Sequence, residues 1–323
     1  MKPIKLILSS LLAGAVLAAS LGAANAAEKI RVANSQKGIW ATTFILYAEE
    51  SKGFFKEAGI DLDILWTNGG ADTQQAIISG SLDLGLNTGT LGVIGPIAKG
   101  ALLTIIAAAT TGSSDIFWYV PANSAIKTFK NTDGKSIGYS RPGSSSYSLA
   151  LDLAKAAGVK PKYVSTGGPA ATLTQALSGQ VDVSWAADLF GANELIDGKI
   201  CRIAVGNDVP GVKDQTVRVH VANTNFLKQH TALVKKFLAT YQKALDWAYT
   251  DPQAIKLYAK MNNVSPALAK KVRDDNYPKM AMALRPIGDF KTSVDQAVAL
   301  KRLDAPLTPE QMKETLRYVD ELK

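Results

Sequence analysis

Short apolar runs alternate with longer amphipathic stretches through the first two thirds of the chain. Runs of strand length occupy residues 30–33, 62–66, 82–86, 102–108, 136–139, 163–164 and 181–184. Helical periodicity occupies residues 41–57, 72–79, 91–99, 144–157 and 170–178. Strands that alternate with helices in this way predict sheets built from parallel βαβ units.

The two halves of this pattern resemble each other locally. Residues 67–70 (TNGG) correspond to residues 165–168 (STGG), and in both halves Gln-Ala, Ser-Gly and then an aspartate, Asp83 or Asp182, follow. One residue must be skipped to keep register, so this is a short echo rather than a tandem array. It indicates either convergent turn chemistry or two similar α/β lobes that face each other.

The pattern changes after about residue 216. Residues 218–221 have the character of one more strand, and the rest of the chain is mostly helical. Helices are predicted over residues 231–250, 252–261, 266–275, 289–300 and 309–322. We expect these helices to cover one lobe and to brace the pair.

The first 26 residues have the pattern of a secretory signal peptide. Two lysines precede an apolar run over residues 6–21, and Ala24-Asn25-Ala26 closes it. A membrane anchor is the alternative, but the run is short of the ~20 apolar residues that span a bilayer. Without a cysteine near the cleavage site, no lipid anchor is expected. We predict cleavage after Ala26 and a mature protein, residues 27–323, in the periplasm.

Composition excludes several classes of protein. Apolar residues make up 47% of the chain and charged residues 20%, which is typical of a packed globular protein. The single cysteine, Cys201, excludes an intramolecular disulfide framework and a multi-thiolate metal site. No cofactor or metal is therefore expected.

The net charge is +8, and removing Lys2 and Lys5 lowers it to +6. Basic residues are scattered, so nucleic acid is not an expected partner, whereas a small anion is compatible.

The familiar catalytic motifs are missing from the chain. Gly134-Lys135-Ser136 looks like the end of a phosphate-binding P-loop, but Phe129 stands where the required glycine belongs. Residues 134–138 (GKSIG) have the G-x-S-x-G spacing, but they lead into a predicted strand rather than from a strand into a helix, so they form no nucleophile elbow. The chain holds no H-E-x-x-H or G-x-G-x-x-G motif. His220 alternates with apolar residues and is predicted to pack in or at the edge of a sheet. His230 lies at a predicted helix start and is expected to be solvated.

The loops that follow the predicted strands are the candidate binding segments, because open α/β sheets bind ligands beyond the carboxyl ends of their strands. The rule selects residues 36–40, 68–71, 87–90, 140–147 and 185–188. Within them the residues predicted to bind the ligand are Gln36, Trp40, Gly70, Thr88, Gly89, Thr90, Ser144, Ser145, Ser146, Trp185 and Asp188.

The segment from Arg141 to Tyr147 carries the sharpest of these signals. Three serines follow Gly143 at a predicted helix start, where free N–H groups and the helix dipole favour an anion. An oxyanion such as sulfonate, sulfate, nitrate or phosphate suits this position. The alternative is an ordinary serine N-cap.

Three other candidates also leave alternatives open. Trp40 and Trp185 are each predicted either to belong to the core or to line the cleft. Asp188 has three possible roles: to bind a cationic group of the ligand, to form a salt bridge with the opposite lobe on closure, or to cap the next helix.

Several short motifs, taken in order, resemble the nitrate/sulfonate/taurine class of solute-binding proteins of ATP-binding-cassette (ABC) importers. They are QK at residues 36–37, SGSLDLG at 79–85 followed by Thr88-Gly89, DGKSIG at 133–138, GSS at 143–145 and LSGQVD at 177–182. The resemblance extends from about residue 29 to residue 225. No single motif is specific, but their order and spacing together are.

The resemblance implies a periplasmic-binding-protein type II fold: two α/β lobes with mixed sheets, two crossing hinge strands and a helical C-terminal tail. The implied organisation is a first lobe over residues 27–118, a second lobe over 119–217, and a return to the first lobe with the tail over 218–323. The crossings are expected near residues 117–120 and 216–221.

The resemblance also implies roles for individual residues. Gln36 matches the family's glutamine near the ligand, Thr88 and Thr90 fall in its first-lobe loop, and Ser144 to Ser146 match its anion-binding helix start. Asp188 falls where many members have an acid after a tryptophan. In this chain that tryptophan is Ala187, the following proline is Leu189, and the histidine of many sulfonate binders is replaced by Ser146-Tyr147.

The expected function is capture rather than catalysis. A monomer is expected to clamp a small anionic organic solute, best an aliphatic sulfonate or taurine, and to deliver it to a membrane permease and its ATPase. Alternatives are a binder of a thiamine-precursor pyrimidine or another small solute, and a sensory protein that presents its ligand to a receptor. A pyrimidine-synthesising enzyme, as in one related group, is disfavoured because Cys201 stands alone.

Overall fold

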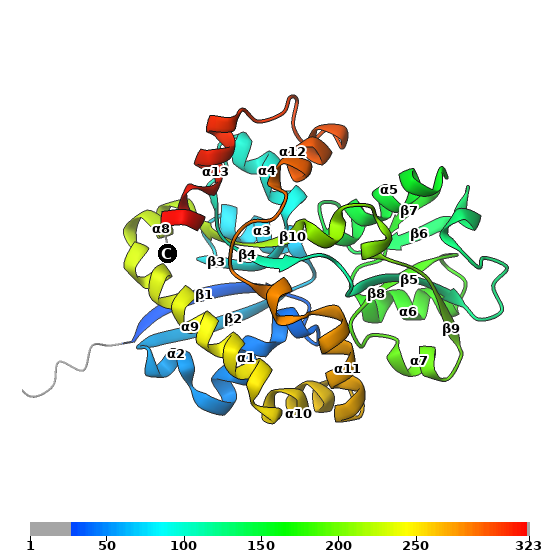
Figure 1. Ribbon diagram of the computed structural model, residues 1–323, viewed down its shortest axis with the longest axis horizontal. Helices are drawn as coiled ribbons and strands as arrows, with labels where there is room; N and C mark the ends of the chain where they lie inside the picture. Colours follow the sequence, from blue (N-terminus) through cyan, green and yellow to red (C-terminus); the bar gives the residue numbers. More distant parts are fainter. Residues whose placement is uncertain (1–26, 322–323) are drawn as a thin grey trace, which may run out of the picture.

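The protein consists of two α/β lobes with a helical tail, and the predicted fold is confirmed (Figure 1). The structure is a computed structural model that describes residues 27–321, so the predicted signal peptide lies outside the described residues. In Figure 1 the first lobe lies at the left and the second at the right.

The first lobe is built on a five-stranded mixed sheet. Its strands follow the order β2 (Ile60–Thr67), β1 (Glu28–Ser35), β3 (Leu84–Gly89), β10 (Thr216–Asn223), β4 (Leu103–Thr111). β1 pairs in parallel with β2 and β3, whereas β10 runs antiparallel between β3 and β4. The expected mixed sheet is confirmed: the parallel βαβ units supply β1, β2 and β3, and β10 is antiparallel to its neighbours because it arrives from the second lobe.

Helices cover both faces of this sheet. They are α1 (Trp40–Lys52), α2 (Phe54–Glu57), α3 (Gly70–Ile78), α4 (Thr90–Ala98) and the C-terminal α8 (Thr224–Gln229), α9 (Thr231–Thr250), α10 (Pro252–Met261), α11 (Pro266–Asn276), α12 (Phe290–Ala299) and α13 (Pro309–Glu321). The single helix predicted over residues 41–57 is broken at Gly53, whose left-handed backbone (φ 65°) ends α1. The predicted helical tail is confirmed: α9 and α10 pack on α1, and α12 on α4.

The second lobe has a three-stranded sheet, β8 (Ser184–Ala187), β5 (Ile116–Pro121), β9 (Ile200–Val205), and a parallel pair, β6 (Ser136–Tyr139) and β7 (Lys162–Ser165). Its helices are α5 (Ser145–Ala157), α6 (Pro169–Leu177) and α7 (Ala192–Ile196). The strand predicted over residues 181–184 begins only at Ser184, where the chain reaches β5, since Val183 makes one isolated bridge to Ile137. β9 was not predicted.

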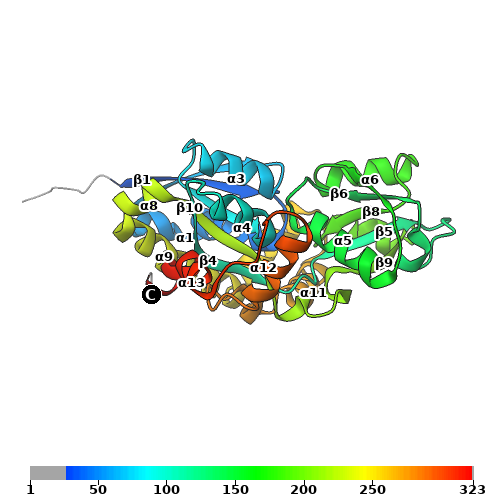
Figure 2. The ribbon, with the colours of Figure 1, turned by 90° about the horizontal axis from the view of Figure 1, so that it is seen from above.

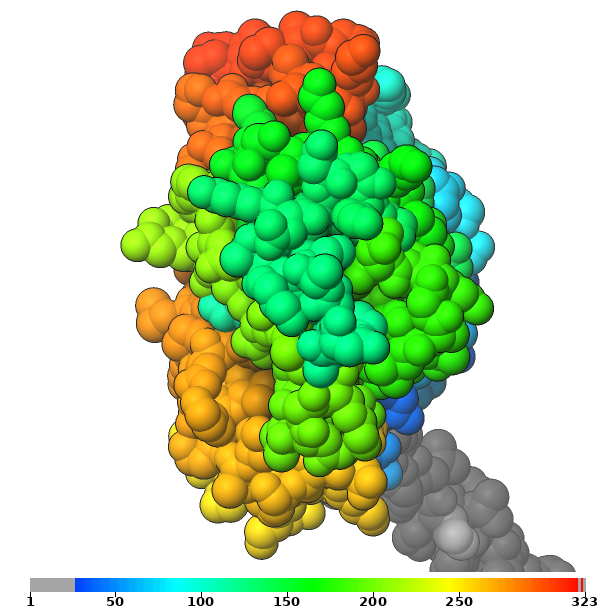
Figure 3. Space-filling model, turned by 90° about the vertical axis from the view of Figure 1, so that its right-hand side faces the viewer, coloured from blue at the N-terminus to red at the C-terminus, as the bar shows by residue number. Residues whose placement is uncertain are grey.

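Two adjacent segments join the lobes (Figure 2). Residues 112–115 lead from β4 to β5, and residues 206–215 lead from β9 to β10. They are bonded to each other, since Gly112 N donates to Gln215 O over 2.9 Å and Ser113 N to Asn207 Oδ1 over 2.7 Å. The crossings therefore come just before the positions expected, which form β5 and β10 themselves. Figure 3 shows parts of the C-terminal tail at the upper and lower margins of the second lobe.

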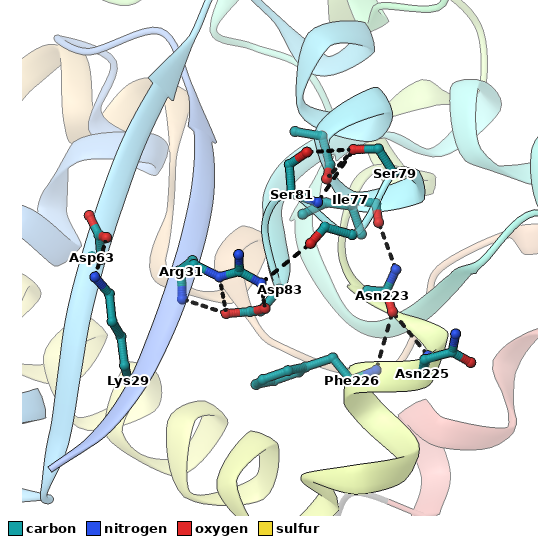
Figure 4. Close-up of polar contacts among 12 residues, drawn as sticks. Lys29, Arg31, Asp63, Ile77, Ser79, Ser81, Asp83, Asn223, Asn225 and Phe226 are labelled. Carbon is teal, nitrogen blue, oxygen red and sulfur yellow. Dashed lines mark hydrogen bonds and ion pairs between the residues drawn. The ribbon is translucent and has the colours of Figure 1, made fainter. Parts of the chain in front are cut away.

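The internal echo has a structural basis in one repeated contact. In the first lobe Asp83 accepts hydrogen bonds from the backbone N–H and the guanidinium of Arg31 on β1 (Figure 4). In the second lobe Asp182 accepts from the backbone N–H and hydroxyl of Ser136 on β6. Each aspartate ties the turn after a helix to the neighbouring strand, which supports two similar α/β lobes.

An aromatic layer forms the core between α1, α9 and α10. Trp40, Phe44, Tyr241 and Tyr258 are fully buried there. His220 packs on Tyr241 with ring centroids 4.9 Å apart, and burial lowers its pKa to about 3. The prediction that His220 packs in a sheet is confirmed.

Candidate functional site

A cavity lies between the lobes, where the carboxyl ends of strands from both sheets meet. Its volume is about 50 Å³, which admits a few water-sized groups. It is lined by Ser35, Gln36, Ile39, Ala41, Thr42, Gly69, Gly70, Asn87, Gly89, Ile116, Ser140, Ser144, Ser145, Ser146, Trp185, Ala187 and Arg218. The lining holds no carboxylate, histidine, cysteine or lysine.

Four helices begin at this cavity. The N-cap residues of α1, α3 and α4 are Ile39, Gly69 and Gly89, and none of them caps its helix with a side chain. α5 is capped by Ser144, whose hydroxyl accepts from Tyr147 N over 3.3 Å. The first N–H groups of a helix lack intrahelical partners and carry partial positive charge. The convergence of four such ends makes the cavity favourable for an anion.

The serines at the start of α5 divide into two kinds. Ser144 and Ser146 are buried and bonded, since their hydroxyl oxygens lie 3.0 Å apart and Ser146 Oγ accepts from Ser140 N over 3.0 Å. Ser145 Oγ makes only a 3.5 Å contact to the carbonyl of Val217. Ser144 thus fills the N-cap role that the sequence left open, and Ser145 keeps its hydroxyl available to a ligand.

Arg218 contributes the only charged side chain of the lining, and the sequence analysis did not select it. It lies on β10, is 9% exposed, and donates to Asp115 from Nη1 over 3.2 Å and from Nη2 over 2.7 Å. Asp115 belongs to the first crossing segment. The sequence did contain a signal for Arg218. This residue stands between Val217 and Val219 in a predicted strand, and a charged residue among the apolar residues of a strand indicates either a buried partner or a role in binding.

The structure brings seven of the eleven predicted site residues together in the lining: Gln36, Gly70, Gly89, Ser144, Ser145, Ser146 and Trp185. Trp185 is 2% exposed, and its indole N–H has no acceptor within the part of the chain that the structure describes. Trp185 therefore lines the cavity with a nearly buried indole ring.

The other four predicted residues lie outside the lining, for identifiable reasons. Trp40 points into the core, against Tyr249 and Tyr258. The Thr88 and Thr90 hydroxyls donate to β10 carbonyls, at Val219 over 3.1 Å and Thr216 over 2.6 Å. Asp188 forms its hydrogen bonds with residues of the opposite lobe.

The contacts of Asp188 decide among its three possible roles. Its Oδ2 accepts from Trp40 N over 2.5 Å and from the Tyr258 hydroxyl over 3.0 Å, both in the first lobe. Asp188 is 3% exposed, and burial, together with repulsion from Asp115, raises its pKa to about 7. It makes a contact across the lobes, with hydrogen bonds in place of the expected salt bridge.

A second, smaller cavity of about 20 Å³ lies behind Gly89 and Ser145. Asp152 of α5 lines it and accepts a hydrogen bond of 3.0 Å from Gln296 of α12, again across the lobes. Burial raises the pKa of Asp152 to about 6. Carboxyl groups therefore join the lobes on both sides of the main cavity.

Glycines allow the lobes to approach this closely. A Cβ on Gly92 of α4 would lie 2.5 Å from the carbonyl oxygen of Gly143, and one on Gly69 would lie 2.9 Å from Ser140 Oγ. Each of these neighbours belongs to the opposite lobe. The observed arrangement is a closed one that any side chain at Gly92 would oppose.

Gly92→Ala is accordingly expected to hold the lobes apart and to weaken solute binding by about tenfold or more, because the added methyl group meets a backbone oxygen. Small-angle scattering and calorimetry measure the two effects. Gly168→Ala is the matched control, since its Cβ would meet nothing within 4 Å and its φ is −73°. An unchanged radius of gyration and affinity in Gly92→Ala contradict the closed arrangement as the binding form.

Residues 27–321 were also compared with the requirements of a metal site and of a membrane-spanning helix. They contain no group of three or more His, Cys, Asp or Glu side chains placed to hold a metal ion. None of their helices combines the length and the apolar character needed to cross a bilayer.

The chain matches one family model, described as NMT1/THI5 like, over residues 40–255. The chain belongs to this family. Among relatives of the NMT1/THI5-like chain, the 4-amino-5-hydroxymethyl-2-methylpyrimidine phosphate synthase THI12 of Saccharomyces cerevisiae is 26% identical over 219 residues. That match covers 64% of the chain and only 63% of the yeast protein. The synthase of Aspergillus parasiticus is 22% identical over 287 residues, 84% of the chain and 83% of that relative.

Solved structures with the same fold include solute-binding proteins. The aliphatic sulphonate binding protein SsuA of Escherichia coli has a TM-score of 0.68 at 22% identity, covering 88% of this chain and 91% of that one. SsuA of Xanthomonas axonopodis pv. citri, bound to MOPS, has a TM-score of 0.70 at 18% identity and covers 90% and 94%. The nitrate-binding protein NrtA of Synechocystis PCC 6803 has a TM-score of 0.67 at 13% identity and covers 91% and 85%. The resemblance to binding proteins of ABC importers is thus confirmed at the level of the fold.

Proposed function

We propose that this NMT1/THI5-like protein is the exported solute-binding component of an ABC importer and captures a small organic anion in the periplasm. The observation that carries the proposal is the meeting of Arg218 with the start of α5 in one cavity between the lobes. A guanidinium and a helix N-terminus are both well suited to an oxyanion. The neighbours SsuA and NrtA, which bind sulfonate and nitrate, support the same class of ligand.

The lining supports an anion with an apolar body and no ammonium group. Ile39, Ile116 and Trp185 supply apolar walls beside the polar serine and arginine groups. No carboxylate lines the cavity, and Asp188, which could have taken an amine, is bonded to Trp40 and Tyr258. An ammonium group would lose its hydration without gaining an anionic partner. We therefore favour an alkyl sulfonate over taurine.

Capture follows from closure of the two lobes. A solute that contacts Gln36 in the first lobe and Ser145 in the second makes its full set of bonds only in the closed form, and this difference in affinity drives closure. The closed form would then dock on the permease. Uptake that persists after deletion of the gene, with signalling lost, would instead favour the sensory alternative.

The test is calorimetry of the mature protein with ethanesulfonate and taurine, which differ only in the ammonium group that taurine carries on its second carbon. Ethanesulfonate is expected to bind at least about tenfold more tightly, a difference of about 1.4 kcal/mol. Nitrate, acetate and an aminopyrimidine complete the panel. Tighter binding of taurine contradicts the absence of an amine site, and binding of the pyrimidine alone overturns the anion proposal.

The relatives named as pyrimidine phosphate synthases make catalysis the second candidate. General acid–base chemistry needs a titratable side chain within reach of the substrate. The cavity lining supplies none, and His220 is fully buried with its pKa lowered to about 3. These observations favour binding over turnover. Formation of a pyrimidine product by the purified protein would reverse that preference.

A further inference from the structure

One carboxylate of the second lobe completes a helix of the first. Asp188 follows β8, and its Oδ2 accepts the N–H of Trp40, the first residue of α1, and the hydroxyl of Tyr258 on α10. The N-cap of α1, Ile39, offers no side-chain acceptor of its own. Asp188 therefore supplies across the lobes the acceptor that an N-cap usually supplies within a helix.

The two oxygens of Asp188 have different surroundings. Oδ2 takes both hydrogen bonds, whereas Oδ1 is buried and has no hydrogen-bond partner among the described residues. A proton can therefore reside on Oδ1 while Oδ2 keeps both bonds to the first lobe.

The charged groups around Asp188 act on that proton in opposite directions. Asp115 repels the carboxylate and favours the proton, whereas Arg218 attracts the carboxylate. Both Nη atoms of Arg218 are bonded to Asp115, so Asp188 has no cation bonded to it. The remaining titratable groups that face it are Tyr47, Tyr249, Tyr258 and Tyr277, whose pKa values burial raises. These tyrosines are neutral throughout the physiological range.

We propose that Asp188 is the positioning residue that holds the two lobes closed, and that protonation of its carboxyl group strengthens closure. We call the contact of Asp188 with Trp40 and Tyr258 the latch. The use of a solute as readout rests on the proposed function, but the latch itself does not.

The sign of the pH dependence follows from the two environments of the carboxyl group. In the closed form burial and Asp115 raise its pKa to about 7, whereas a hydrated aspartate in separated lobes titrates near 3.9. Closure therefore takes up a proton between these values. The added stability of the closed form is complete at acid pH and is lost as pH rises through about 7.

The experiment is calorimetry with ethanesulfonate, which does not titrate in this range, at pH 5.5 and pH 8. The unchanged protein is expected to bind on the order of tenfold more weakly at pH 8. Asp188→Asn keeps an acceptor oxygen but cannot ionise, so it is expected to lose most of the pH dependence and to keep only the smaller part that Asp152 contributes. Asp188→Ala removes the acceptor and is expected to bind weakly at both.

Asp152→Asn is the matched control, because it removes the other buried carboxyl group that joins the lobes and leaves Asp188 in place. Whatever its absolute affinity, it is expected to keep most of the pH dependence. A pH dependence that survives in Asp188→Asn but disappears in Asp152→Asn overturns the proposal, as does an unchanged protein whose affinity does not vary with pH.

A readout without solute separates the latch from the proposed function. Spin labels on exposed Cys201 in the second lobe and on a cysteine introduced at Lys56 in the first report the distance between the lobes. The shorter distance is expected to be more populated at pH 5.5 than at pH 8, and this difference is expected to be much smaller in Asp188→Asn. If ethanesulfonate fails to bind while this shift persists, only the proposed function fails. A distance distribution that is independent of pH overturns the latch.

Discussion

Arg218→Met is expected to abolish binding of an anionic solute and to lower the free energy of unfolding by about 3–5 kcal/mol. Arg218 is the only charged side chain of the cavity lining, and it also holds Asp115, whose side chain is 1% exposed. Without the guanidinium, Asp115 stays buried beside Asp188 with no cation bonded to it. Calorimetry measures the loss of binding, and urea unfolding measures the loss of stability.

A second substitution separates the two effects of Arg218→Met. Adding Asp115→Asn removes the unpaired charge, so most of the stability is expected to return while solute binding stays lost. Lys29→Met is the control, because it breaks an exposed ion pair with Asp63 in the same sheet and should leave the unfolding midpoint nearly unchanged. Retained affinity in Arg218→Met contradicts the assignment of the guanidinium to the solute.

Ser145→Trp is expected to weaken solute binding by roughly a hundredfold or more, because the indole occupies a cavity of only about 50 Å³. Stability should change little. Ser145 is partly exposed at the first position of α5, and its hydroxyl makes only the 3.5 Å contact to Val217. Calorimetry and thermal unfolding measure the two quantities.

Position 145 also lies against Gly89, since a Cβ on that glycine would be 3.2 Å from Ser145 N. The indole is therefore expected to keep the lobes apart as well as to fill the site. Ser178→Trp places the same side chain on the exposed end of α6 and serves as control. If Ser145→Trp binds the solute normally, the solute lies elsewhere in the cleft.

Local patterns predicted most of the secondary structure. The helices of the tail, such as Thr231–Thr250 and Pro252–Met261, begin and end where the periodicity and capping residues place them. The errors occur where long-range contacts decide. β9 pairs only with β5, 79 to 88 positions earlier in the chain, and the direction of β10 depends on the crossing from the second lobe.

The candidate site divides in the same way. Loops after strands and a serine-rich helix start are visible in the sequence, and they led to Gln36, Gly70, Gly89, Trp185 and the serines of α5. Arg218 was not predicted, because its position depends on the ion pair with Asp115. Asp115 lies in a connecting segment that has neither strand nor helix periodicity.

The sequence by itself determined the alternation of strands and helices, the helical tail and the anion-favouring start of α5, because these follow from contacts within short stretches of chain. The two-lobed fold was indicated by the resemblance to a known family. Only the tertiary structure decided what the cleft contains. It placed Arg218 in the lining and Asp188 outside it. A buried charged or polar group needs hydrogen-bond partners, and the fold supplies them from distant parts of the chain. Those partners lie 103 positions from Arg218 and 148 positions from Asp188, beyond the reach of any local pattern.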